Sequence, residues 1–599
     1  MNSTIVTGYR QKAIDSQKEI YKYEKLINIY SFLRLAVFAL VVIAIYLSIK
    51  TIGFSLLVVL FIVLMLCFVW LVSRQSFFEE QKNYFIALKT VTENEITSIA
   101  DYSNIYNNGN QFADEKHHYT ADLDIFGKSS LFQLTNRSAT ALGNRLLAVW
   151  LSAPAAKNTI LTRQQALKEL SVKNEWKLDF QAKLLFANYA NADHLNNLFS
   201  YLKLSLKLSG ENFIRFYIKI APFLLLGTII AGYFYSIISI LGIAVAIFNS
   251  LILISKGSYM IKSDSIADKI GKTLSSYILV FKTIENEQWQ GDGCTTLANK
   301  LKIEGTSRKI KELSNLINKL TLSGVFFVGF VLNVFFLWSL KQIIAIEDWK
   351  KNNQQSFEAS FDVIAEFEAL ISLSSLHINY PGWCFPEIAG GDAYTLIAKG
   401  LAHPLINKQK RVENDYQLDN AFKIDIITGS NMAGKSTFLR TVGINTALAL
   451  CGAPVCATEM EVSVLTIISY MRIKDSLNES TSTFKAELDR LQMLLAAIEK
   501  ENKVFFLIDE MLRGTNSIDK YLGSKAVIEQ LIRKRAVGMV ATHDLQIAEL
   551  EKSYPDYIRN FYFDIQVQGG EMLFDYKIKH GECKTFNATL LLKQIGIEI

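Results

Sequence analysis

The sequence has few cysteines and almost no excess of charge of either sign. Its 599 residues include six cysteines, and no two of them have the spacing of a metal-binding pair. Cys451 and Cys456 lie near each other in an apolar stretch, so we expect reduced cysteines without disulfide partners. Lysine and arginine number 63 against 57 acidic residues, a net charge of +6. This composition argues against a disulfide scaffold, a zinc domain and a strongly basic nucleic-acid binder.

The N-terminal end also lacks the pattern of a signal peptide, because residues 1–27 are polar and mixed in charge. The length predicts several domains. Half of the residues are hydrophobic, and they gather in a few uncharged runs. Residues 54–72 carry no charge and are long enough to cross a bilayer. Residues 30–49 form a second apolar run, and four residues, 50–53, separate it from the first. The two runs therefore predict a transmembrane hairpin that turns at 50–53.

A second hairpin is predicted from the uncharged run at 220–254, which is long enough for two short spans that turn near Tyr235 and Ser236. Basic residues flank both hairpins, which favours placing their ends on the cytoplasmic side. The sequence therefore predicts four membrane spans and a multi-pass protein of the cell membrane.

Residues 429–436 read Gly-Ser-Asn-Met-Ala-Gly-Lys-Ser, the pattern of a phosphate-binding loop between an apolar strand at 422–428 and a helix at 437–450. The glycines allow a tight turn whose N–H groups face phosphates, and the following helix directs its positive end at the same charge. Lys435 is expected to reach the β- and γ-phosphates, and Ser436 to bind Mg²⁺. The sequence thus predicts an ATP and Mg²⁺ site. Its loop residues are Gly429, Ser430, Asn431, Met432, Ala433, Gly434, Lys435, Ser436 and Thr437.

An apolar strand at 504–510 ends in Asp509 and Glu510, at the sheet edge where α/β proteins bind ligands. Asp509 is the second candidate Mg²⁺ ligand, and Glu510 is the candidate catalytic base. A further strand at 538–541 leads to His543, a candidate sensor of the γ-phosphate. The alternatives are a solvated acidic cap on a core strand and a structural histidine.

These motifs together resemble the MutS family of mismatch-repair ATPases. The matching segments are 428–437, Ser482-Thr483-Phe484 ahead of Glu487, Asp509-Glu510 with Arg513-Gly514-Thr515, and Ala541-Thr542-His543. Upstream, residues 124–151 resemble the start of the MutS lever or core domain, and residues 357–388 its return. The resemblance implies an α/β P-loop ATPase domain of the ABC-like, MutS type. It also implies an all-α lever or core domain, here with inserted transmembrane helical hairpins.

The resemblance further implies that the ATP sites are composite and form in a homodimer. Ser482 would act across the dimer on the partner's γ-phosphate, and Asp519 would lie at the same interface; both could instead be simple helix caps. Asn414 lies in the segment that cradles the adenine, and Arg411 stands where an aromatic residue often stacks on it. Two departures are Met511-Leu512, where a small residue is usual, and Lys520, where glycine is usual.

The apolar run at 322–340 is interpreted as a buried lever helix, because a fifth span would separate two parts of the MutS-like region. The predicted divisions follow the chain. They are a cytoplasmic N-terminal helix at 1–29, hairpin 1 at 30–74, a connecting helical segment at 75–119, the first lever part at 120–212, hairpin 2 at 213–256, the second lever part at 257–389 and the ATPase domain at 390–599.

The sequence thus predicts a membrane-anchored MutS-family ATPase with cytoplasmic lever and ATPase domains. The family resemblance implies coupling to double-stranded DNA, although no mismatch reader is recognisable before residue 120. The alternative is an ABC-like mechanochemical membrane ATPase that acts on a membrane or protein partner without DNA. A weaker alternative is a passive membrane scaffold with a decaying nucleotide site.

Overall fold

A computed structural model describes residues 2–50, 54–189, 193–203, 210–324, 326–419, 423–430, 432–471, 483–568 and 571–583. The chain forms two compact units. The first comprises Met1–Ser138, Asn144–Leu178 and Glu368–Ile599, and the second comprises Ala139–Gly143 and Asp179–Phe367.

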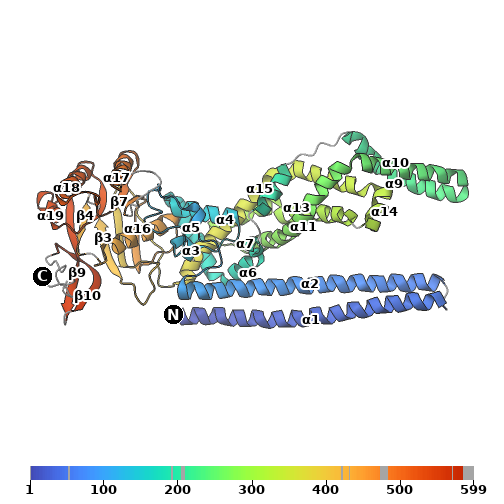
Figure 1. The fold of residues 1–599 in the computed structure, drawn as a ribbon, viewed down its shortest axis with the longest axis horizontal. Helices are drawn as coiled ribbons and strands as arrows, with labels where there is room; N and C mark the ends of the chain where they lie inside the picture. Colours follow the sequence, from blue (N-terminus) through green and yellow to red (C-terminus); the bar gives the residue numbers. More distant parts are fainter. Residues whose placement is uncertain are drawn as a thin grey trace. The chain divides into compact units, whose positions relative to one another are not determined.

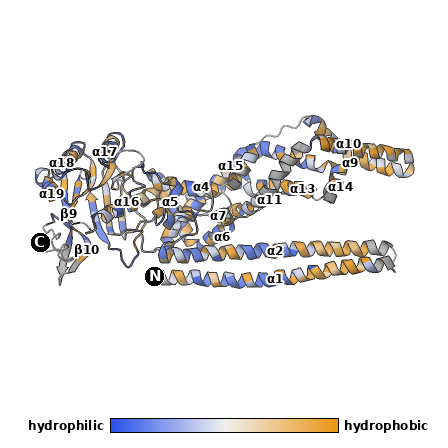
Figure 2. Ribbon diagram, in the orientation of Figure 1, coloured by the Kyte–Doolittle hydropathy of each residue, from blue (hydrophilic) through white to orange (hydrophobic). Residues whose placement is uncertain are grey.

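The first unit begins with two long helices, α1 (Asn2–Lys50) and α2 (Phe54–Asp101), which lie side by side (Figure 1). Aromatic rings join them, with Tyr30 edge-on to Phe78 at 5.0 Å. Figure 2 shows that both helices are hydrophobic along the stretch next to their connection and largely hydrophilic elsewhere. Each helix runs unbroken across the predicted divisions at 29 and 74, because no glycine or proline interrupts its backbone hydrogen bonds there. Most of the predicted turn, residues 51–53, lies outside the described part of the chain.

Short helices follow and pack the core of the first unit. They are the 3-10 turn η1 (Asn110–Phe112), α3 (Leu131–Thr135), α4 (Ala141–Ser152), α5 (Lys157–Val172) and α6 (Asn174–Leu184). The predicted connecting segment at 75–119 is therefore α-helical only to Asp101, and after that it holds only the short 3-10 turn η1. The division between the two units falls within α4, α6 and the long helix α15 (Trp338–Asn379).

The C-terminal part of the first unit contains a six-stranded sheet in the order β10-β9-β4-β8-β7-β6. Its strands are β4 (Ile424–Thr428), β6 (Thr466–Tyr470), β7 (Val504–Asp509), β8 (Val537–Ala541), β9 (Ile558–Gln568) and β10 (Glu571–His580). All neighbours pair in parallel except β9 with β10. Strands β4, β7 and β8 are fully buried, as expected for parallel strands covered on both faces. Their carboxyl ends bring Thr428, Asp509 and Ala541 to one edge.

The other elements of this region cover and flank that sheet. A second sheet has the order β1-β5-β2-β3, with β1 (Glu387–Ile388), β2 (Thr395–Leu401), β3 (Asn414–Asp419) and β5 (Glu459–Val462). The helices are α16 (Lys435–Cys451), α17 (Thr483–Lys500), α18 (Ser517–Arg533), α19 (Leu545–Ala548) and α20 (Leu550–Ser553). The strands and helix predicted around residues 422–450, 504–510 and 538–541 are all present, shifted by a few residues at their ends.

The second unit is helical among its described residues. It holds α7 (Phe186–Tyr189), α8 (Asp193–Lys203), α9 (Glu211–Phe234), α10 (Ser236–Ser255), α11 (Gly257–Glu285), α12 (Asp292–Glu304), α13 (Thr306–Thr321), the 3-10 turn η2 (Leu322–Gly324) and α14 (Phe326–Phe336). Helices α9 and α10 form the hairpin expected from the sequence, with the break at Tyr235. By length and composition, the described single helices long and apolar enough to cross a membrane are α1, α2, α9 and α10, and the bent pair of α14 and α15 is a candidate fifth span.

The interpretation of residues 322–340 as one buried lever helix is wrong. The run forms α14, only 11 residues long, and then bends by 75° into α15 at Leu337, whose φ is 47°. Helix α14 packs against α9 and α10, and the side chain of Phe330 is 65% exposed. Helix α14 alone, about 16 Å long at 1.5 Å per residue, does not reach across a bilayer core of about 30 Å, but together with the start of α15 it is apolar enough for a bent span. The run is therefore a bent pair of helices whose first part contacts the apolar hairpin and leaves apolar side chains exposed.

Candidate nucleotide site

The glycine-rich loop joins β4, inside the parallel sheet, to the N-terminus of α16. Gly429 and Gly434 have φ of 143° and 112°, which side chains rarely tolerate. A Cβ added to Gly429 would lie 2.8 Å from the carbonyl oxygen of Phe563. Met432 has a φ of 72° and is mostly exposed, and Asn431 lies outside the described residues. Gly429 and Gly434 are therefore positions at which a residue with a side chain would be strained.

Lys435 is buried, and its ammonium group is bound by the loop itself. Its Nζ donates to the carbonyl oxygens of Gly429 at 2.8 Å and Ser430 at 2.9 Å. Burial lowers the pKa of Lys435, and the nearby charges of Glu510 and Asp509 oppose that shift.

Asp509 lies at the carboxyl end of β7 beside the start of α16. The Ser436 hydroxyl hydrogen-bonds to its carboxylate, while burial raises the pKa of Asp509. The Oδ1 atom of Asp509 is buried and has no hydrogen-bond partner among the described residues. A hydroxyl beside an unsatisfied carboxylate oxygen is a pair of hard oxygen ligands, so these two residues fit Mg²⁺.

Glu510 follows Asp509 and is held from three directions. Its backbone has a φ of 55°, and its N–H donates to the carbonyl oxygen of Ala541 at 3.0 Å. Arg513 Nε lies 3.3 Å from Oε2, and His543 Nδ1 lies 3.3 Å from Oε1. Burial opposes ionisation, but Arg513 and His543 outweigh it and lower the pKa of Glu510. The structure thus brings Glu510 and His543 together and keeps the carboxylate ionised.

Two residues of α18 adjoin this group or lie near it. Lys520 Nζ lies 3.4 Å from His543 Nε2, so the residue that departs from the family pattern contacts the candidate sensor. Asn516 caps α18, accepting the N–H of Asp519 and donating to its carboxylate at 2.7 Å. Asp519 is therefore an exposed residue of the first turn rather than the cap. Ser482 lies outside the described residues, and α17 begins at the next position.

The two candidate adenine contacts, Asn414 and Arg411, make different interactions in the structure. The Asn414 amide donates to the carbonyl oxygen of Tyr576 at 3.0 Å and accepts the N–H of Ile578 at 2.9 Å. The Asn414 side chain therefore holds β10 in place. In that strand Tyr576 has a φ of 52°, and its ring lies close to Gly434: a Cβ added to Gly434 would be 3.1 Å from the ring. Arg411 lines a pocket whose walls include no residue of the glycine-rich loop.

Sequence reasoning missed three contacts of this site. Arg513 was recognised only as part of a motif, Lys520 only as a departure, and Tyr576 not at all. Arg513 also receives support from Glu487, whose Oε1 accepts the backbone N–H of Arg513 at 3.1 Å. A strand of ordinary composition surrounds Tyr576, so the sequence offers no local signal for it.

Comparison with known proteins matches this same region. Residues 425–590 match the family model for MutS domain V. This part of the chain has the sequence of a MutS domain V. A DNA mismatch repair protein MutS from Thermotoga maritima is 33% identical over 240 residues, which cover 39% of this chain and 29% of the relative. Those of Caldicellulosiruptor bescii and Aquifex pyrophilus are 30% and 32% identical over 40% and 37% of this chain.

The chain covers less than a third of the length of these MutS proteins, 27% and 26% for the last two. The match to the MutS domain spans the glycine-rich loop, both acids and His543. The apolar helices α1, α2, α9 and α10 lie outside it. The family model therefore accounts for the C-terminal region of the chain, at 425–590.

Proposed function

We propose that this chain is a membrane-anchored MutS-type P-loop ATPase that binds and hydrolyses ATP. The observation that carries this proposal is the convergence of Lys435, Ser436, Asp509 and Glu510 at one edge of the parallel sheet. The loop N–H groups and Lys435 bind the phosphates, and Ser436 and Asp509 hold Mg²⁺. The metal ion, when bound, neutralises charge on the phosphate oxygens.

Glu510 is the residue that orients or deprotonates the attacking water. The contacts to Arg513 and His543 keep its carboxylate ionised and fix its direction, which general-base chemistry requires. His543 stands at the same edge, where it contacts the terminal phosphate. The passive-scaffold alternative is disfavoured, because a decaying site would not retain this set of charged contacts.

Two copies of the chain form composite sites in this proposal. Asp519 is exposed in the first turn of α18, which supports a role at a surface that faces a second copy. Ser482 acts across the same surface, as the family resemblance implies. In this proposal the paired ATPase domains close on ATP binding and open after hydrolysis, and the lever helices transmit this movement.

Membrane anchoring rests on the exposed apolar helices. The most apolar 18-residue stretch of each helix is largely unburied. The buried share of that stretch is 0% in α1, 6% in α2, 22% in α9 and 11% in α10. A soluble protein rarely leaves so much continuous apolar surface exposed to water. We therefore propose that these helices lie in the cell membrane, with the lever and MutS domains on the cytoplasmic side.

Two outputs of the ATPase have support. The matched relatives are named DNA mismatch repair proteins, which favours ATP-controlled binding of double-stranded DNA. The net charge of only +6 and the exposed apolar helices favour a different output, in which a mechanochemical ATPase moves a membrane or protein partner. DNA binding is the first candidate because it follows from the matched domain.

Glu510→Gln tests the catalytic proposal in the full-length protein in detergent or lipid. The variant should bind Mg·ATP like the unaltered chain and lose ATP turnover by about 100-fold or more, the usual worth of a general base. Glu501→Gln is a matched control, because Glu501 is exposed on the approach to the same strand. Equal turnover in both variants would remove Glu510 from the role.

The two outputs are separated by measuring ATP turnover with and without duplex DNA across a range of salt concentrations. Contacts with the DNA backbone should change turnover at low salt, and the effect should fall steeply as salt rises. A flat response to every DNA structure, with turnover that depends on the lipid, would instead support the mechanochemical function.

A further inference from the structure

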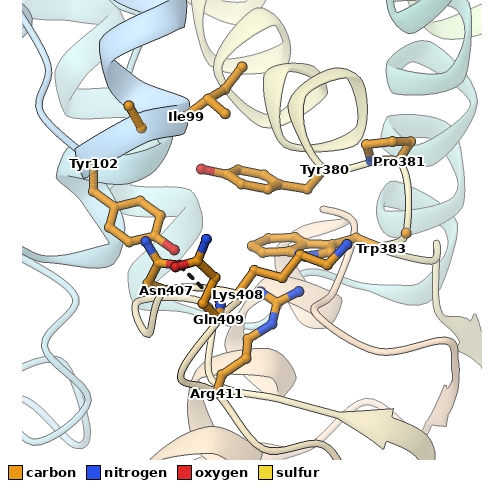
Figure 3. A pocket seen from close by; sticks show the side chains of 11 residues that line it. Ile99, Tyr102, Tyr380, Pro381, Trp383, Asn407, Lys408, Gln409 and Arg411 are labelled. Atoms are coloured by element: carbon orange, nitrogen blue, oxygen red, sulfur yellow. Dashed lines mark hydrogen bonds between the residues drawn. The ribbon is translucent and has the colours of Figure 1, made fainter. Parts of the chain in front are cut away.

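The first unit contains a pocket of about 700 Å³ that belongs to neither the glycine-rich loop nor the acidic edge. Three separate segments build it: the end of α2, the residues after α15, and the connection between β2 and β3. Figure 3 shows the side chains of these segments directed toward one space. Its volume lies within the roughly 300–1,000 Å³ range of small-molecule sites.

Aromatic rings form much of the wall. Tyr380 and Trp383 stack at 4.8 Å with an angle of 17° between their planes, and Tyr102 lies on another side of the space (Figure 3). The hydroxyl of Tyr102 donates to the carbonyl oxygen of Ile406 at 3.3 Å, which fixes its ring. Tyr102 also has a φ of 62°, a backbone conformation that a residue with a side chain rarely adopts.

Positive charge is available at the same pocket. Lys408 and Arg411 are among the lining residues, and no lining residue is acidic. Within the described ranges, neither side chain has an ion pair, and the buried Nε atom of Arg411 has no hydrogen-bond partner. The amides of Asn407 and Gln409 complete the polar side. A buried N–H group without an acceptor costs free energy, and a bound acceptor at Nε would recover it.

The structural alternative is an aromatic cluster that joins three segments and has ordinary surface lysines near it. That alternative explains the stacked pair of Tyr380 and Trp383. It does not explain a cavity of this size, nor the buried Nε atom of Arg411 that has no hydrogen-bond partner at its wall. Aromatic rings next to two cationic side chains suit a nucleotide. The base can stack on an aromatic side chain, and the phosphate can pair with arginine.

We propose that this pocket binds a nucleotide, with its base against Tyr380 and Tyr102 and its phosphate on Arg411 and Lys408. It is a second site, distinct from the proposed ATP site, and Arg411 serves it rather than the adenine at the glycine-rich loop. The ligand could be a free mononucleotide or the end nucleotide of a single strand, which share this chemistry.

The test counts radiolabelled ADP bound at saturation to the full-length protein in detergent. Two ADP per chain are expected, one lost in Lys435→Ala and the other in the double variant Lys408→Gln, Arg411→Gln, with at least a tenfold loss of affinity at that site. Lys410→Gln is the matched control, an exposed neighbouring lysine that does not line the pocket. It should leave both sites unchanged. Both glutamine substitutions lie at the polar side, so the fold should survive them.

The outcomes distinguish this proposal from the proposed ATP site. Loss of binding in Lys408→Gln, Arg411→Gln but not in Lys435→Ala would support the pocket and contradict the ATP site. Binding of a single ADP per chain that is lost in Lys435→Ala would overturn the proposed pocket site. Binding of a second ADP that is unchanged in the double variant would overturn it as well. A short single-stranded oligonucleotide that displaces only the Arg411-dependent ADP identifies a strand end as the ligand; failure to displace it identifies the free nucleotide.

Discussion

The carboxylate of Glu95 accepts two hydrogen bonds from the guanidinium of Arg137, at 2.8 Å from Nε to Oε1 and 3.0 Å from Nη2 to Oε2. Both side chains are almost fully buried. Lys177 lies 3.8 Å from the same carboxylate, and the Asn379 amide donates to it at 2.7 Å. Tyr9 in turn donates to Asn379 at 3.1 Å. One carboxylate therefore ties α1, α2, α6 and α15 to the loop before α4.

Replacing Glu95 should destabilise the first unit strongly. Glu95→Gln leaves Arg137 and Lys177 buried without a counter-charge, and breaking a buried pair in this way costs about 3–5 kcal/mol. Denaturant unfolding in detergent measures the difference. Glu93→Gln is the control, because Glu93 is an exposed neighbour paired only with Lys89 at 3.6 Å. It should cost less than about 1 kcal/mol. Similar losses in both variants would mean that the buried network contributes no more than a surface pair.

The same network predicts two pH windows of stability. Burial opposes the charge of Glu95, but Arg137 and Lys177 outweigh it and lower its pKa from 4.5 to about 2. The stability from Glu95 is therefore present above pH 4.5 and is lost as pH falls toward 2. Burial lowers the pKa of Lys177 from 10.5 to about 8, against the attraction of Glu95. Between pH 8 and 10.5 the unfolded chain holds more protons at Lys177, so stability rises with pH there.

Lys177→Met separates these windows. The variant should lose the rise in unfolding free energy between pH 8 and 10.5 and keep the acid loss that Glu95 and Arg137 produce. Unfolding midpoints at matched pH values measure both. A basic window that survives in Lys177→Met would assign it to another group.

Lys520 should restrain ATP turnover. An ammonium group only donates hydrogen bonds, so Lys520 favours the histidine form in which Nε2 accepts and Nδ1 faces Glu510 with its proton. That form cannot donate from Nε2 to a phosphate. Lys520→Gly, the residue usual in the family, should raise kcat about two- to tenfold, the worth of one hydrogen bond, with KM little changed. Lys525→Met on the same helix should have no effect. An equal rise in a variant that also carries His543→Asn would show that Lys520 does not act through His543.

Cys67 is a natural reporter of membrane insertion. Of the six cysteines, all free thiols, it is the exposed one, and it lies in the apolar stretch of α2. In membrane vesicles it should react with a lipid-soluble maleimide and resist a water-soluble one. Lys18→Cys, on the polar part of α1, should react with the water-soluble reagent once the vesicles are opened. Equal aqueous labelling at both positions would contradict insertion of α2.

Local patterns were enough to predict the backbone of the site. The two glycines of the loop need φ values that only glycine adopts readily, so the turn between β4 and α16 follows from their spacing. The buried strands that end at Asp509 and Ala541 are uninterrupted apolar runs, and parallel pairing then brings their ends to one edge. The hairpin of α9 and α10 follows from an uncharged run too long for one span. In each case the information lies within a few consecutive residues.

What the sequence by itself determined is therefore the order and type of these elements and the acids, lysine and histidine that meet at the sheet edge. The tertiary structure alone decided that Asn414 holds β10, that Arg411 lines a separate pocket, that Lys520 contacts His543, and that α14 covers an apolar hairpin. It also decided that Glu95 and Arg137 meet inside the first unit. Such contacts join residues far apart in the chain, and they depend on how side chains pack, which no local periodicity encodes.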